Sequence, residues 1–71
     1  MFYFDEKMLV VGNFSKILLI SDNEICFDFK RYHLNVSGDK LVMPYLEDKE
    51  AGVKGIIKNI GLKYKMVKDD V

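Results

Sequence analysis

Short stretches of alternating apolar and polar residues cover most of this chain. The clearest lies at residues 24–30, where every second position holds a large apolar side chain, namely Ile25, Phe27 and Phe29. Successive side chains of a β-strand point to opposite faces of its sheet. The spacing therefore predicts a half-buried strand whose three large apolar side chains face the core.

The same reasoning predicts further strands at residues 8–12, 16–21, 33–37, 41–43, 53–57 and 60–66, separated by turns at residues 12–13, 22–23 and 38–39. The alternation changes parity between the last two strands, which predicts a turn or a bulge near Lys58 and Asn59. Pro44 has no amide hydrogen, so it should end its strand or confine that strand to an edge of the sheet. Gly38 and Gly55 are expected at turns or bulges where a side chain is poorly tolerated.

Only residues 45–52 have a composition that favours a helix, and we expect at most one short helical turn there. The predicted fold is a single all-β domain over residues 1–71, an antiparallel meander curled into a small sandwich or barrel. Residues 1–7 and 67–71 are expected to be loose tails.

Length and charge limit the possible functions. A chain of 71 residues builds only a small core, which favours self-association or a docking partner. Its eleven basic and eleven acidic residues balance, so the simplest reason to expect nucleic-acid binding is missing. Residues 51–71 nevertheless carry five lysines and only two acids. We take Lys54, Lys58, Lys63 and Lys65 as the candidate interaction surface, against the simpler reading of a solvated strand face.

The sequence offers little catalytic chemistry. Cys26 is the only cysteine and His33 the only histidine, so neither a disulfide nor a common zinc-ligand set can form within one chain. A catalytic Cys26–His33 pair would need a third group to orient it, and none is apparent. The paired carboxylates, Asp22 with Glu24 and Glu47 with Asp48, fall at predicted turns, and the glycines match no phosphate-binding loop. We therefore expect no enzymatic activity, no cofactor and no metal.

No apolar run approaches the length of a membrane helix, and the first residues carry acids where a signal peptide would carry bases. The expected location is the cytoplasm.

Several short motifs occur in an order that resembles the YabP/YqfC family of bacterial sporulation proteins. They are VVGN at residues 10–13, ISDNEI at 20–25, SGDKLVM at 37–43 and VKGIIKNI at 53–60. GNFSKI and PYLEDKE place the chain closer to the YqfC side. The resemblance implies a small all-β protein without assigned enzymatic activity. It also implies that the protein acts in the mother cell during endospore formation, at the membrane around the forespore, together with a membrane protein partner. It transfers no catalytic residue, because the motifs consist of structural glycines and core aliphatics.

The sequence thus predicts a non-enzymatic structural or interaction protein that binds a membrane protein partner and forms homo-oligomers, with peripheral membrane association and no small-molecule substrate. The main alternative is a small nucleic-acid-binding barrel, in which exposed tyrosines such as Tyr32, Tyr45 or Tyr64 would stack on bases. An enzyme or a ligand carrier ranks below both.

Overall fold

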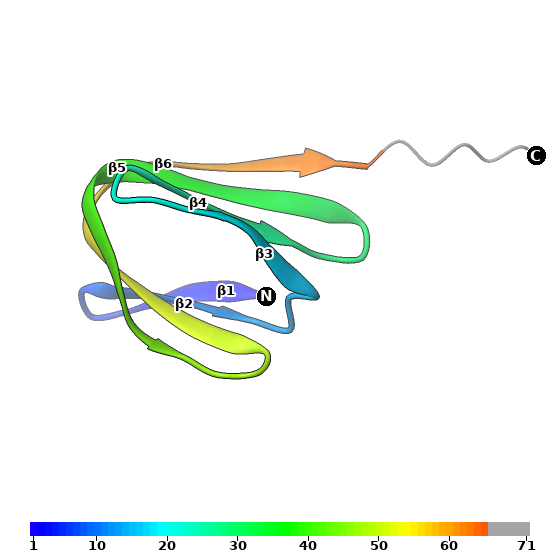
Figure 1. Ribbon diagram of the computed structural model, residues 1–71, viewed down its shortest axis with the longest axis horizontal. Helices are drawn as coiled ribbons and strands as arrows, with labels where there is room; N and C mark the ends of the chain where they lie inside the picture. Colours follow the sequence, from blue (N-terminus) through cyan, green and yellow to red (C-terminus); the bar gives the residue numbers. More distant parts are fainter. Residues whose placement is uncertain (66–71) are drawn as a thin grey trace, which may run out of the picture.

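The computed structural model describes residues 1–65, whose strands form one antiparallel β-sheet (Figure 1). The strands are β1 (Phe2–Asp5), β2 (Met8–Gly12), β3 (Lys16–Ile20), β4 (Glu24–Asp28), β5 (Tyr32–Leu46) and β6 (Glu50–Tyr64). Their order across the sheet is β1-β2-β6-β5-β4-β3. The outermost strands, β1 and β3, do not pair with each other, so the sheet stays open. In this part of the chain we find no helix able to cross a membrane.

The long hairpin of β5 and β6 folds the sheet over on itself. Its register shifts at three places, between Ser37 and Gly38, between Asp39 and Val42, and between Val42 and Tyr45. Bulges of this kind bend a strand and increase its twist. In Figure 1 the hairpin bends at the left, which places β3 and β4 in one layer and β1 and β2 in the other. Each layer is completed by one half of β5 and one half of β6.

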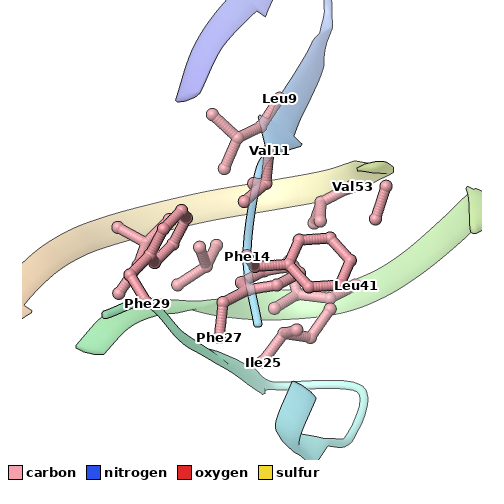
Figure 2. Close-up of a cluster of buried hydrophobic side chains, with 11 residues drawn as sticks. Leu9, Val11, Phe14, Ile25, Phe27, Phe29, Leu41 and Val53 are labelled. Atoms are coloured by element: carbon pink, nitrogen blue, oxygen red, sulfur yellow. The ribbon is translucent and has the colours of Figure 1, made fainter. Parts of the chain in front are cut away.

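The core lies between these two layers. Figure 2 shows side chains from β2, β4, β5 and β6 that converge on Phe14 and Phe27, whose ring centroids are 5.1 Å apart. The core members are Leu9, Val11, Phe14, Ile25, Phe27, Phe29, Leu34, Val36, Leu41, Ala51 and Val53. Ile25, Phe27 and Phe29 are at most 5% exposed, which confirms the predicted facing of this strand. The all-β fold is likewise confirmed.

Gly38 and Gly55 lie at bulges of the long hairpin, as expected for residues that exclude a side chain. A Cβ atom added to Gly38 would lie 1.9 Å from the carbonyl oxygen of Ile56. Gly55 has a φ of +133°, and a Cβ atom there would lie 2.6 Å from the carbonyl oxygen of Lys40. The predicted bulge near residue 58 is also present, because Ser37 pairs with Asn59 and Gly38 pairs with Ile57, so that Lys58 is the extra residue.

The structure corrects the expected turn at Gly38 and Asp39. Strand β5 continues through these residues, and the chain reverses only at residues 47–49. Glycine is favoured both at turns and at bulges, because both can require a close approach of the backbone. Gly38 in the sequence therefore could not distinguish a turn from a bulge. Pro44 lies within β5, where β4 no longer pairs with it, so the proline occupies an edge position.

Two further segments differ from the expectation. Phe2–Asp5 is the edge strand β1, paired with β2, rather than part of a loose tail. Residues 45–52 form the β5–β6 hairpin and contain no helical turn, because Tyr45 pairs with Gly52 and Leu46 with Ala51. The expected tail at residues 67–71 lies outside the described residues.

Candidate interaction surfaces

The four lysines expected to form an interaction surface lie on β6 or directly after it, but they do not make one stripe. Lys54 borders a shallow open depression together with Asp5, Glu6, Lys7 and Met8, where acids lie close by. The Nζ atom of Lys58 lies 2.8 Å from the Oδ2 atom of Asp39, in an ion pair whose two side chains are more than half exposed. Lys58 is itself the bulge residue of β6, and it interrupts the strand between Lys54 on one side and Lys63 and Lys65 on the other. That these four residues bind a partner stays a prediction.

Asp28, His33 and Lys65 form a cluster on the outer face of the sheet. The Oδ1 atom of Asp28 lies 2.9 Å from Lys65 Nζ and 3.1 Å from His33 Nε2, while the Asp28 side chain is only 14% exposed. The Lys65 ammonium group and the Asp28 carboxylate therefore form an ion pair. Lys65, supported by His33 and Lys16, lowers the pKa of the Asp28 carboxyl below its ordinary value. Lys65 therefore already has an acidic partner within the chain.

Cys26 and His33 are not joined in a catalytic arrangement. Cys26 pairs across the sheet with Asn35, whereas His33 pairs with Asp28. Burial raises the pKa of the Cys26 thiol, which disfavours the thiolate that a nucleophile would need. Among residues 1–65 no hydrogen bond links Cys26 to His33, and no cluster of histidine, cysteine and acids has the geometry to hold a metal ion.

Three of the four paired carboxylates lie at hairpin turns, as the sequence predicts, whereas Glu24 is the first residue of β4. Asp22 is exposed at the β3–β4 turn, and Glu24 accepts a hydrogen bond from the side-chain amide of Asn35. Glu47 and Asp48 are exposed at the β5–β6 turn. Asp22 borders an open depression with Asp39 and Lys40, and Glu47 and Asp48 are solvated, which are the usual surroundings of turn residues.

Comparisons with family models, with curated proteins and with solved structures gave no match.

Sequence reasoning named Lys63, Tyr32 and Tyr64 as candidates but did not group them with Lys30 and Arg31 at a basic, aromatic end of the molecule, which we call the basic tip. It consists of Lys30, Arg31, Tyr32, Leu62, Lys63 and Tyr64. The β4–β5 turn supplies the first two residues, and the end of β6 lies beside that turn, because the Lys65 amide donates to the Arg31 carbonyl oxygen at 2.9 Å. The sheet register places Tyr32 opposite Tyr64. Only the β5–β6 pairing brings these two distant segments together.

The three tyrosines proposed for stacking have different surroundings. Tyr64 is 67% exposed, and its ring centroid lies 5.5 Å from that of Tyr32. The Tyr32 ring in turn stacks on the buried Phe29 at 4.7 Å, so an aromatic row leads from the core to the surface. Tyr45 instead donates a hydrogen bond to Glu50 at 2.8 Å, which raises the pKa of Tyr45 to about 12. Tyr45 is thus occupied within the chain.

Unpaired strand edges are the second prominent surface feature. β1 and β3 end the sheet, and β6 pairs with β2 only from Glu50 to Val53, which leaves residues 54–64 of β6 bonded to β5 alone. Edge β3 has three successive exposed aliphatic side chains, Leu18, Leu19 and Ile20. Open edges expose unpaired amides and carbonyls that can bond to another strand.

Proposed function

We propose that this protein is a non-enzymatic interaction module that acts in the mother cell during endospore formation and docks to a membrane protein partner. The observation that carries the proposal is the ordered set of motifs that resembles the YabP/YqfC family. Open strand edges and exposed apolar side chains support a role in binding rather than in chemistry.

The positions of those motifs in the fold agree with this proposal. ISDNEI forms the β3–β4 hairpin, VVGN ends β2 with Asn13 at a φ of 64°, and the other two motifs contain the bulges at Gly38 and Gly55. Each motif therefore contains a turn or bulge that specifies the fold. These motifs therefore build the scaffold, and in this proposal the partner binds to the surface that the scaffold presents.

Affinity capture from sporulating cells tests the proposal. A tagged copy of the protein should recover a membrane protein when detergent solubilises the membranes, and the soluble fraction prepared without detergent should lack that protein. The same capture from vegetative cells is the control. Recovery of no membrane protein from sporulating cells would contradict the proposal.

A small nucleic-acid-binding barrel is the second candidate, because the basic tip combines cations with the exposed Tyr64 and the half-buried Tyr32. Stacking on aromatic rings and phosphate contacts to lysine and arginine are how such barrels hold single strands. This candidate requires binding that weakens steeply as salt rises. The zero net charge of the protein, and the acidic residues elsewhere on its surface, count against nucleic-acid binding.

Self-association is part of the same proposal, and β3 is the edge best suited to it. Charged side chains on an edge strand hinder pairing with another chain. The free half of β6 carries lysines, and the acids Asp5 and Glu6 lie at the end of β1, whereas residues 17–20 of β3 carry no charge. An antiparallel pair of β3 strands centred on Leu19 would set Leu19 of one copy opposite Leu19 of the other, next to the bulge at Leu18.

Sedimentation across a wide concentration range should therefore show dimers or larger species. Leu19→Glu, which sets two like charges opposite each other at the centre of the pair, should shift the protein to monomer. Leu46→Glu changes a similarly exposed leucine away from β3 and should leave the assembly intact. A wild-type protein that stays monomeric at high concentration would refute self-association.

A further inference from the structure

The geometry points to the basic tip as a site that binds an anionic phospholipid surface directly, independently of any protein partner. The tip offers the two kinds of contact that such a surface accepts, which are cations for the lipid headgroups and exposed apolar or aromatic side chains for the interface below them. This inference goes beyond the proposed function, since it assigns the membrane contact to the chain itself.

The cations of the tip are available for binding. Lys30, Arg31 and Lys63 are exposed, and none of them takes part in an ion pair within residues 1–65. The nearby acid, Asp28, is already held by Lys65 and His33 on the outer face of the sheet. The tip therefore keeps a local positive charge in a chain whose net charge is zero.

The apolar part of the tip lies on the inner face of the sheet, next to the turn that carries Lys30 and Arg31, whereas Lys63 pairs with His33 and belongs to the outer face. Leu62 is 44% exposed and Tyr64 is 67% exposed. Leu62 pairs with the buried Leu34, so it belongs to the inner face of the sheet, at a place that the second layer does not cover. In Figure 1 the end of β6 and the β4–β5 turn extend at the right beyond β1 and β2. A flat surface can therefore reach this end without touching the other layer.

The distribution of acids favours a membrane over a nucleic acid. Glu47, Asp48 and Glu50 lie at the hairpin turn of the opposite layer, and Asp22 with Asp39 lies beside another turn. A polyanion that follows the protein surface would meet these acids. Among residues 1–65 a planar bilayer would touch only the tip. At physiological salt, charges more than about 8 Å from the contact are largely screened.

Flotation of the purified protein with phospholipid vesicles tests this inference. The protein should bind vesicles in which about a third of the phosphatidylcholine is replaced by phosphatidylglycerol, and should not bind phosphatidylcholine alone. Reversing the three free cations together, by Lys30→Glu, Arg31→Glu and Lys63→Glu, should lower the partition coefficient by about two orders of magnitude or more. Tyr64→Ser should lower it severalfold, and Tyr64→Phe should retain it.

The matched control reverses three exposed lysines away from the tip, by Lys7→Glu, Lys40→Glu and Lys49→Glu. This variant has the same net charge as the tip variant and should bind vesicles nearly as well as wild type. Circular dichroism checks that both variants are folded. Equal loss in the two variants would reduce the effect to net charge and overturn the assignment of the tip.

A labelled single-stranded oligonucleotide, followed by fluorescence anisotropy, completes the test. Binding of the oligonucleotide through the tip, with no binding to anionic vesicles, would overturn the lipid assignment in favour of a nucleic acid. Absence of binding to either probe would also overturn it. Since purified protein and lipid are the only components, these results leave the proposed protein partner, tested by capture from cells, unaffected.

Discussion

Replacing Phe27 with aspartate should abolish folding of the protein. Phe27 is fully buried between the two layers, and its ring packs against Phe14 (Figure 2). Loss of a buried phenylalanine side chain alone costs about 3–5 kcal/mol, and an unpaired carboxylate at the same place adds several more. Stabilities of small domains are about 5–15 kcal/mol, so the two costs together remove most or all of the folding free energy.

Circular dichroism and thermal denaturation measure this effect. Phe4→Asp is the matched control, because Phe4 lies on the edge strand β1 and is 56% exposed. We expect Phe4→Asp to keep a cooperative melt near that of wild type. A native spectrum and a cooperative transition for Phe27→Asp would mean that β4 does not face the core.

Phe27 also shows why the facing of β4 could be predicted from the sequence. Strand β4 is short and has no bulge in its pairing with β5, so its two-residue period passes directly from sequence to burial. The same holds for Leu34 and Val36, which are fully buried. Local alternation is sufficient to predict which side chains are buried wherever one face of a regular strand covers the core.

The continuity of β5 could not be predicted in this way. Its register shifts three times between Ser37 and Tyr45, and each shift breaks the two-residue period. Gly38 and Pro44 then suggest the end of a strand, although the chain only bends. Strand β1 was missed for a different reason, since three of its four residues are exposed and its pairing with β2 depends on the sheet rather than on its own pattern.

The candidate sites show the same limit. Lys63 and Lys65 lie two residues apart on one predicted strand, so the sequence alone places them on the same face. The contribution of Lys30 and Arg31 to the same surface depends on the register that sets Tyr32 against Tyr64, and this pairing joins residues far apart in the chain. Composition alone also gave no sign that Lys58 and Lys65 form ion pairs with acids of other strands.

Valine at Gly38 or at Gly55 should destabilise the protein severely, whereas valine at Gly61 should not. At Gly38 the new Cβ would lie 1.9 Å from the backbone oxygen of Ile56, a distance that forces the two central strands apart. At Gly55 the φ of +133° adds about 1–3 kcal/mol of backbone strain, and the Cβ would also lie 2.6 Å from a carbonyl oxygen of β5. Gly61 lies on the same strand as Gly55, and an added Cβ meets no atom within 4 Å there.

Chemical denaturation of the three variants compares these positions directly. Gly61→Val should match or exceed the stability of wild type, because valine favours a strand and a strand glycine loses more backbone entropy on folding. Gly38→Val and Gly55→Val should lose a large part of a stability that is about 5–15 kcal/mol for a domain of this kind, or fail to fold. Because the bulges at these two glycines bend β5 and β6 across both layers, their loss should also expose the core. Wild-type stability in either variant would show that the hairpin does not need the close backbone approach that the bulges create.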